Sequence, residues 1–148
     1  MIAEKVGLGY MREIHEIHEV PGLLREIPDP PKILYGQGNI DLLKKTDCLY
    51  VCIVGPRKAS PYGYDVTKLI LEHLSLFNVI VVSGAAYGID GLVHTLSLQN
   101  GIPTIAVPGS GISDESFYPK AHLELKHEII DNGGLVINEF HPFAKADV

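Results

Sequence analysis

The chain has 148 residues and a net charge of −6, and 46% of its residues are apolar. These values are those of an ordinary globular protein of one domain. Its apolar runs are too short to cross a bilayer, and residues 1–10 lack the pattern of a secretory signal, so we expect a cytoplasmic protein. The negative charge gives no support to non-specific nucleic-acid binding, although it leaves room for a local basic site.

The two cysteines are too few for a disulfide scaffold. Cys52 lies in the apolar run 49–54, where we expect a reduced thiol that packs as a small hydrophobe in a buried strand. His15 and His18 have no further ligands nearby in the sequence, so a solvated surface is favoured over a metal site. We therefore expect neither a metal nor a cofactor.

The N-terminal part of the chain differs from the rest. Apolar residues recur there every three to four positions and predict an amphipathic helix from about residue 5 to residue 20: Val6, Tyr10, Ile14 and Ile17. Prolines at 21, 28, 30 and 31 then predict an extended connector, with one helical turn at residues 23–25. We accordingly divide the chain into an N-terminal helix and connector, residues 1–31, and a main domain, residues 32–148.

In the main domain, predicted strands and helices alternate. The strands are residues 33–36, 49–54, 79–82, 104–107 and 135–137, and the helices are residues 40–45, 62–77, 89–99 and 122–131. The run at 79–82 is wholly β-branched, which is typical of a strand covered on both faces, and we interpret 49–54 as a buried central strand. This order predicts an α/β fold, a doubly wound, mostly parallel Rossmann-like sheet with a small N-terminal helical cap, whose ligands bind at the carboxyl ends of the strands.

The loop after residues 49–54 combines a glycine, Gly55, with two cations and a helix start. Ser60 followed by Pro61 is a strong N-cap and first-turn pair, so the free N–H groups and the dipole of the next helix would stabilise an anion there. Arg57 can hold a phosphate with two hydrogen bonds, whereas Lys58 acts as a point charge. The other interpretation pairs Arg57 with a carboxylate and leaves Lys58 solvated.

The loop after residues 79–82 is rich in small residues. Ser83 and Gly84 leave the strand and Gly88 begins the helix, so a phosphate can approach the backbone closely. Asp90 in the first helical turn is equally consistent with a helix-start carboxylate and with a ligand contact. We expect His94 to be a packed or capped histidine rather than a catalyst.

The loop after residues 104–107 runs from Pro108 to Lys120. Gly109, Ser110 and Gly111 offer backbone amides. Lys120 is the first Lys or Arg after Lys68 and returns a positive charge to the same edge of the sheet. Its length is equally consistent with a binding loop and with a structural connection.

The sequence patterns of several enzyme classes are missing. None of the loops has the G-x-x-x-x-G-K-[ST] pattern, and no G-x-G-x-x-G follows a strand, so a Walker ATPase and an ordinary NAD-binding fold are disfavoured. A G-x-S-x-G elbow for a catalytic serine is missing too. We therefore expect a binding protein without catalytic residues.

Several short motifs occur in a fixed order along the chain. They are Pro30–Gly36 with Gly38-Asn39, Val54–Arg57 with Ser60 and Tyr62-Gly63, Ser83–Ala85 with Gly88–Asp90 and His94, Pro103–Val107 with Gly109 and Gly111, Tyr118-Pro119, and Gly133-Gly134 with Glu139. With these motifs the chain resembles the DNA-processing protein A family, also called DprA or Smf, over about residues 21–142.

The resemblance implies an extended Rossmann-like domain that binds single-stranded DNA, acts as a dimer and helps to load the RecA recombinase during natural transformation. It also implies that Arg57 holds a phosphate and that Lys120 lies in a loop that helps to form a basic DNA pocket. Where the family usually has an arginine before Gly-Ile-Asp, this chain has Tyr87, which removes a cation but offers a ring that can stack on a base. His122 stands where an asparagine is usual, and Pro56 replaces a small polar residue.

The candidate residues for binding phosphate or nucleic acid are therefore Gly55, Arg57, Lys58, Ser60, Ser83, Gly84, Tyr87, Gly88, Asp90, Gly109, Ser110, Gly111 and Lys120. The leading interpretation is a binder of single-stranded DNA with RecA as a further partner. The alternative is a nucleotide-binding protein related to the lonely-guy phosphoribohydrolases, which hold nucleotides at similar loops, although their Pro-Gly-Gly and Thr-x-x-Glu signature is missing. A third interpretation is a shortened domain that folds but has lost its activity.

Self-association is also expected. The family domain continues past the match to Glu139 with further strands. We therefore expect the strand at residues 135–138, with Phe140 and Phe143 beyond it, to leave an unpaired apolar edge that forms a homo-oligomer.

Overall fold

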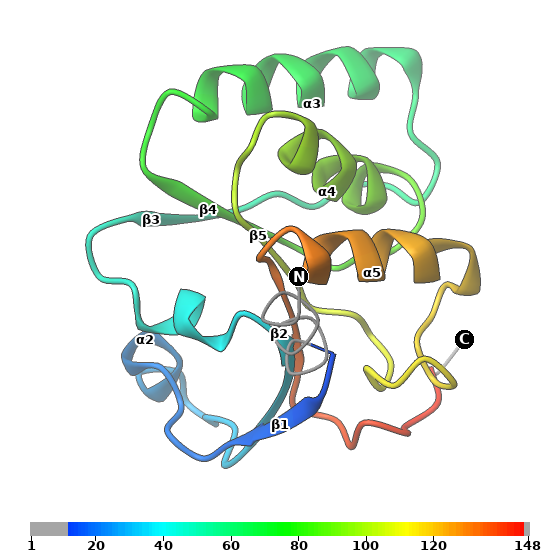
Figure 1. The fold of residues 1–148 in the computed structure, drawn as a ribbon. Helices are drawn as coiled ribbons and strands as arrows, with labels where there is room; N and C mark the ends of the chain where they lie inside the picture. Colours follow the sequence, from blue (N-terminus) through cyan, green and yellow to red (C-terminus); the bar gives the residue numbers. More distant parts are fainter. Residues whose placement is uncertain (1–11, 147–148) are drawn as a thin grey trace, which may run out of the picture.

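The computed structural model describes residues 12–146 (Figure 1). Within these residues one sheet of six strands has the order β1-β2-β6-β5-β4-β3. The strands are β1 Ile14–Ile17, β2 Leu34–Gly38, β3 Leu49–Cys52, β4 Val79–Ser83, β5 Thr104–Ala106 and β6 Leu135–Asn138. Strands β3 to β6 are parallel, whereas β2 pairs antiparallel with β6 and β1 pairs antiparallel with β2. The prediction of a mostly parallel sheet is confirmed.

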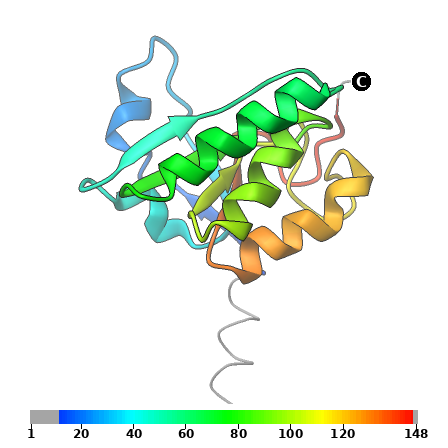
Figure 2. The same ribbon diagram turned by 90° about the horizontal axis from the view of Figure 1, so that it is seen from above.

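The longer helices lie on one face of the sheet. They are α3 Pro61–Leu74, α4 Ile89–Gln99 and α5 Leu123–Asp131, and Figure 2 shows them side by side. The opposite face carries short elements, α2 Gly22–Arg25 and the 3-10 helix η1 Ile40–Lys44, and a second 3-10 helix, η2 Lys120–His122, leads into α5. Both faces are thus covered, as expected for a Rossmann-like α/β fold.

The core follows the alternation of side chains along the strands. In β4, Val79 and Val81 pack against α3 and α4, whereas Ile80 packs in the opposite layer with Leu42 of η1. A third cluster joins β5 and β6 to α5 and includes Ala106, Val136, Ile129 and Ile130. Because each strand contributes to both layers, its apolar residues are continuous in sequence.

The predicted helix over residues 5–20 is wrong for residues 14–17, which form β1, and residues 5–11 lie outside the described part of the chain. Ile14 and Ile17 are three positions apart, so in a strand they point to opposite faces. Ile14 packs in the α5 layer and Ile17 packs in the layer of α2 and η1. A spacing of three residues between apolar positions is therefore compatible with one face of a helix and also with a strand that packs against a layer on each side. His15 and His18 accordingly stand on or beside a strand.

The predicted helical turn at residues 23–25 is confirmed within α2. The residues predicted as a helix at 40–45 form the 3-10 helix η1. The division of the chain at residue 31 stays a prediction.

The prediction that residues 49–54 form a buried central strand is wrong. Strand β3 is the last strand of the sheet, and within the described residues it pairs with β4 alone. Leu49 and Val54 are 69% and 67% exposed, and the Cys52 thiol is exposed rather than packed. An apolar run of this length does not tell an edge strand from a central one.

The expected unpaired edge at residues 135–138 is also wrong. Strand β6 lies between β2 and β5, and all its residues are buried. Phe140 and Phe143 beyond it are partly exposed. Self-association stays a prediction, but β6 is not its surface.

Candidate functional site

Three loops at the carboxyl ends of β3, β4 and β5 meet around one small cavity. The cavity has a volume of about 140 Å³ and is lined by Arg57, Gly84, Ala86, Tyr87, Gly109, Tyr118, Pro119 and Ala146. The three loops singled out in the sequence thus lie together at one place in the fold. The candidate list contains Arg57, Gly84, Tyr87 and Gly109 but misses the other four. Tyr118 and Pro119 belong to a motif noted in the sequence, whereas Ala86 and Ala146 carry no chemical signal.

The first loop is held in place by its packing on the start of α4. The N–H of Ile89 donates to the carbonyl oxygen of Pro56 at 3.2 Å. A Cβ on Gly55 would lie 2.8 Å from the Ile89 side chain, so this position has room only for glycine. Gly88, the N-cap residue of α4, has a φ of 77°, which also favours glycine. These contacts fix the backbone on which the exposed Arg57 and Lys58 stand.

The buried Asp90 connects the first two loops. Its Oδ1 accepts a hydrogen bond from the N–H of Gly55 at 3.3 Å. A Cβ on Gly84 would lie 2.6 Å from its Oδ2. Its carboxylate thus holds the first loop by a hydrogen bond and packs closely against the backbone of the second loop at Gly84. The sequence left Asp90 either as a helix-start carboxylate or as a ligand contact. The structure shows it in the first turn of α4, hydrogen-bonded to the loop after β3.

The three candidate serines have hydrogen-bond partners within the fold. Ser60 is the N-cap of α3, and its Oγ accepts from the N–H of Gly63 at 3.0 Å. Ser83 is buried and donates to the carbonyl oxygen of Ile53 at 2.7 Å, which ties β4 to the end of β3. Ser110 is buried too, and its Oγ accepts from the N–H of Tyr118 at 2.9 Å. Each hydroxyl stabilises a loop, and none of the three serines lines the cavity.

Tyr87 forms an aromatic rim of the cavity and is 41% exposed. Its ring contacts Tyr118 and His122 edge-on, at centroid distances of 6.3 and 5.3 Å. His122 is itself fixed, because its Nδ1 lies 2.9 Å from the carbonyl oxygen of Ala85. Ala85 has a φ of 60°, an uncommon conformation for a residue with a Cβ. The loop after β4 is thus held in one conformation that presents an aromatic ring.

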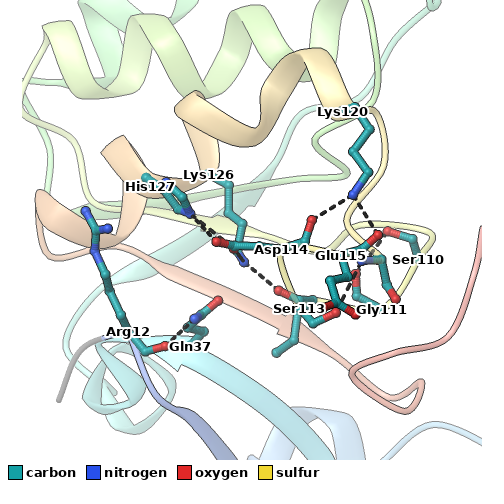
Figure 3. Close-up of polar contacts among 12 residues, drawn as sticks. Arg12, Gln37, Ser110, Gly111, Ser113, Asp114, Glu115, Lys120, Lys126 and His127 are labelled. Atoms are coloured by element: carbon teal, nitrogen blue, oxygen red, sulfur yellow. Dashed lines mark hydrogen bonds and ion pairs between the residues drawn. The ribbon is translucent and has the colours of Figure 1, made fainter. Parts of the chain in front are cut away.

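The structure does not bring Lys120 into the cavity. Its Nζ donates to the carbonyl oxygens of Asp114 and Glu115, at 2.7 and 2.6 Å (Figure 3). The N–H of Gly111 donates to the carbonyl oxygen of Ala144 at 2.7 Å, so this amide is not open to a phosphate. Gly109 stands exposed at the cavity. The third loop therefore contributes Gly109 and Tyr118 rather than Lys120 and Gly111.

His94 lies fully buried behind the loops. Its Nδ1 lies 2.8 Å from Thr104 Oγ1, which donates to the carbonyl oxygen of Val81 at 3.1 Å. His94 and Thr104 thus share one buried hydrogen bond. Burial lowers the pKa of His94 from its ordinary 6.5 to about 4. The expectation of a packed histidine is confirmed.

Residues 13–148 match the model of the family described as DNA recombination-mediator protein A. The chain belongs to this family. It is 41% identical over 122 residues to the DNA processing protein DprA of Streptococcus pneumoniae and 34% identical over 121 residues to the protein Smf of Escherichia coli. These matches cover 82% and 81% of this chain but 41% and 31% of the relatives. The chain thus spans less than half the length of these relatives.

Solved structures of two DprA proteins share the fold. The Helicobacter pylori protein, whose structure describes its single-stranded DNA binding mode, matches with a TM-score of 0.77 and 26% identity over 92% of this chain and 60% of that chain. The S. pneumoniae protein matches with a TM-score of 0.78 and 35% identity over 93% of this chain and 47% of that chain. The Rossmann-like fold and the resemblance to DprA and Smf are both confirmed.

Two structural findings bear on other classes of function. No helix in the described part of the chain is long and apolar enough to span a membrane. Among residues 12–146, no three His, Cys, Asp or Glu side chains are grouped so that they can hold a metal ion. The roles of the individual cavity residues stay predictions.

Proposed function

We propose that this chain binds single-stranded DNA at the cavity between the loops that follow β3, β4 and β5. The observation that carries the proposal is the meeting of Arg57, Tyr87 and exposed glycine backbone around one cavity. A cation that tracks the phosphate backbone, beside an aromatic ring on which a base can stack, is the combination that single-stranded DNA binders use. The DNA-binding mode of the H. pylori relative supports the same conclusion.

The size of the cavity favours a strand over a free nucleotide. Pockets that enclose a small molecule usually measure ~300 to 1,000 Å³. A volume of about 140 Å³ suits one phosphate group, with the rest of the ligand lying outside. This observation disfavours the alternative of a small-nucleotide protein, and adenosine monophosphate is the competitor that tests it.

Each cavity residue has a distinct role in this proposal. Arg57 holds a phosphate through two hydrogen bonds, and Lys58 beside it adds attraction that is screened by salt. Tyr87 stacks on a base. Gly84 and Gly109 let the DNA backbone approach the loops, while Asp90 keeps the loops in register from beneath. Lys120 contributes only if its Nζ exchanges the carbonyl oxygens of Asp114 and Glu115 for a phosphate.

The test is fluorescence anisotropy of a labelled oligothymidylate titrated with the chain at low and at physiological salt. We expect saturable binding that weakens steeply with salt and that unlabelled duplex or adenosine monophosphate displaces poorly. Arg57→Ala should weaken binding by about tenfold or more, since one charge-assisted contact is lost. The slope of log K against log salt should fall by about 0.7, the value for one phosphate of a single strand.

The matched control is Arg25→Ala. Arg25 is an exposed arginine on α2, in the layer on the opposite face of the sheet, so its loss changes the net charge equally without touching the cavity. Equal weakening by the two substitutions would show general electrostatics rather than a site at Arg57. Tight binding of adenosine monophosphate with no binding of oligothymidylate would replace the proposal by the small-nucleotide alternative.

We also propose, on the family's description as a recombination mediator, that the bound strand is passed to RecA in the cytoplasm. The readout is the rate of ATP hydrolysis by RecA on oligothymidylate, with and without the chain. A stimulated rate that Arg57→Ala removes supports this step. An unchanged rate, with DNA binding intact, would limit the function of the chain to binding the strand.

A further inference from the structure

A second and larger cavity lies away from the three loops. Its volume is about 550 Å³, and it shares no lining residue with the cavity at Arg57. Its floor is formed by β1 and β2, one wall by α5 and the other by the segment that follows β6. Within residues 12–146 the sheet extends past α5, so that none of the described helices covers β1 on this face (Figure 1).

A buried amide oxygen faces this cavity without a partner. Gln37 of β2 is only 7% exposed, and its Nε2 donates to the carbonyl oxygen of Arg12. Its Oε1 has no hydrogen-bond partner among residues 12–146. A flipped amide would set this oxygen against the carbonyl oxygen of Arg12, so the orientation is fixed. Figure 3 shows the amide rising from β2 into the space between Arg12 and Asp114. A ligand that donates a hydrogen bond here satisfies a group that the fold leaves open.

The charged groups around Gln37 also favour a donor. The carboxylates of Glu16 and Asp114 both line the cavity and are more than half exposed. Partial burial by itself raises the pKa of Asp114, but hydrogen bonds from Lys126 and His127 outweigh it and hold the pKa below its ordinary value. Asp114 is therefore ionised near neutral pH.

The cations nearest the cavity already have acidic partners. The guanidinium of Arg12 donates to Asp131, with Nη2 and Oδ2 2.6 Å apart. The Nζ of Lys126 lies 2.6 Å from Asp114 Oδ1, and His127 Nε2 lies 3.1 Å from its carboxylate. Asp131 pairs with Arg12, and Lys126 pairs with Asp114. Among the described lining residues this leaves the Glu16 carboxylate, 3.5 Å from His18 Nε2, and the acceptor Gln37 Oε1, so the group that suits the cavity is a positively charged donor.

An aromatic wall defines the shape of that donor. The rings of Tyr35 and His141 meet edge-on at 6.0 Å, and His141 is followed by the ring of Phe143 at 5.8 Å. Phe143 is 58% exposed at the mouth of the cavity. A flat cation stacks on such rings, and a guanidinium does so better than the compact ammonium of lysine.

We propose that this cavity binds the guanidinium group of an arginine side chain from a partner polypeptide. The guanidinium donates to Gln37 Oε1 and to the carboxylates of Glu16 and Asp114, and its flat face lies on Phe143. A nucleotide fits less well, because its phosphate would approach the two carboxylates. The site is independent of the cavity at Arg57 and stands or falls separately from DNA binding.

The test is a titration of the ¹⁵N-labelled chain with N-acetyl-argininamide, followed by nuclear magnetic resonance. We expect saturable shifts at the side-chain amide of Gln37 and at the backbone amides of Glu16 and Phe143. The neutral analogue N-acetyl-citrullinamide keeps the shape but loses the charge, and we expect it to bind at least fivefold more weakly. N-acetyl-lysinamide keeps the charge but loses the flat face and should also bind more weakly.

Substitutions separate the site from general attraction to an acidic chain. Glu16→Gln and Phe143→Ala should each weaken N-acetyl-argininamide binding by about two- to fivefold, in line with exposed ion pairs and cation–π contacts. Glu124→Gln on the exposed side of α5 removes the same charge and should leave binding unchanged. Equal binding of the citrulline analogue, shifts that map elsewhere, or preferred binding of adenosine monophosphate at Gln37 would each overturn the proposal.

Discussion

Gly88 lies so close to Pro56 that a Cβ on Gly88 would stand 2.3 Å from the carbonyl oxygen of Pro56. The same Cβ would lie 2.6 Å from the carbonyl oxygen of Arg57. The loop after β3 therefore packs directly on the backbone of the loop after β4. The position of Arg57 depends on the absence of a side chain at residue 88.

Gly88→Ala should both destabilise the fold and weaken DNA binding. The new Cβ clashes with two backbone carbonyls and the φ of 77° strains any residue other than glycine, so we expect a loss of about 2 to 4 kcal/mol in the free energy of unfolding. Urea unfolding and the anisotropy titration measure the two effects.

Gly101→Ala is the matched control for this substitution. Gly101 has a φ of 67°, but a Cβ there meets nothing within 4 Å. It should cost only about 1 kcal/mol, from backbone strain alone, and leave DNA binding unchanged. If Gly88→Ala binds oligothymidylate as tightly as the unsubstituted chain, the second loop does not position Arg57 for binding.

Tyr87→Ala should weaken the binding of oligothymidylate more than it changes stability. Stacking of one base on an aromatic side chain contributes about 1 to 3 kcal/mol, so the dissociation constant should rise by about fivefold or more. Because stacking is not an ionic contact, the salt dependence should stay unchanged. Phe77→Ala removes a ring that is 66% exposed beyond the far end of α3 and serves as the control. Equal effects of the two variants would argue against a base at Tyr87.

Acid should destabilise the fold through His94. Its pKa is about 4 in the fold and close to 6.5 when unfolded, so between these values the unfolded chain binds more protons. The stabilisation is therefore fully present above pH 6.5 and is lost as the pH falls toward 4. The shift corresponds to roughly 3 kcal/mol at most.

Chemical denaturation at several pH values measures this dependence. His94→Asn keeps an amide that can donate to Thr104 but cannot titrate, so its stability should fall less steeply between pH 6.5 and 4. The resonances of His94 in the intact chain give its pKa directly. A value near 6.5 would rule out this source of acid sensitivity even if the variant folds poorly.

The loops were predictable because their signals are local. Gly55, Gly84 and Gly88 follow or precede apolar runs, and a glycine at such a position marks a close backbone approach whatever the rest of the chain does. Arg57 follows from its place between a strand end and a helix start. The family motifs provide further information, because they occur in a fixed order along the chain, which composition does not describe.

The order of the strands was not predictable from the same signals. Strand β3 and strand β6 both have continuous apolar sequences, yet β3 stands at the edge and β6 at the centre. The difference arises because β2 pairs antiparallel with the outer edge of β6, and β1 pairs in turn with β2. Strand pairing joins residues far apart in the chain, so periodicity within one segment cannot rank the strands.

The direction of a long side chain is equally hidden. Lys120 lies in a loop that leads to the cavity, but its flexible stem brings the Nζ to two carbonyls of the preceding loop. Lys126 looks like a polar position on a helix, yet it is fully buried, because residues 112–114 fold over it. The hydrogen bonds of Lys120 and Lys126 both depend on how residues 112–115 fold back onto α5 and the turn before it.

Lys126→Met tests the energetic weight of that contact. The Nζ donates to the carbonyl oxygen of Ile112 and to Asp114, each at 2.6 Å, and burial lowers the pKa of Lys126 although Asp114 opposes the shift. Methionine fills the same volume but leaves a buried carbonyl oxygen without its donor. We expect the free energy of unfolding to fall by about 1 to 3 kcal/mol in urea denaturation.

Lys120→Met is the matched control. It removes an ammonium that also bonds to two carbonyl oxygens, but at an exposed position where water replaces it, so the loss in the free energy of unfolding should stay below about 0.5 kcal/mol. Equal losses for the two lysines would mean that burial adds nothing to the contact at Lys126, and the segment over α5 would then be held by Ile112 and Phe117 packing alone.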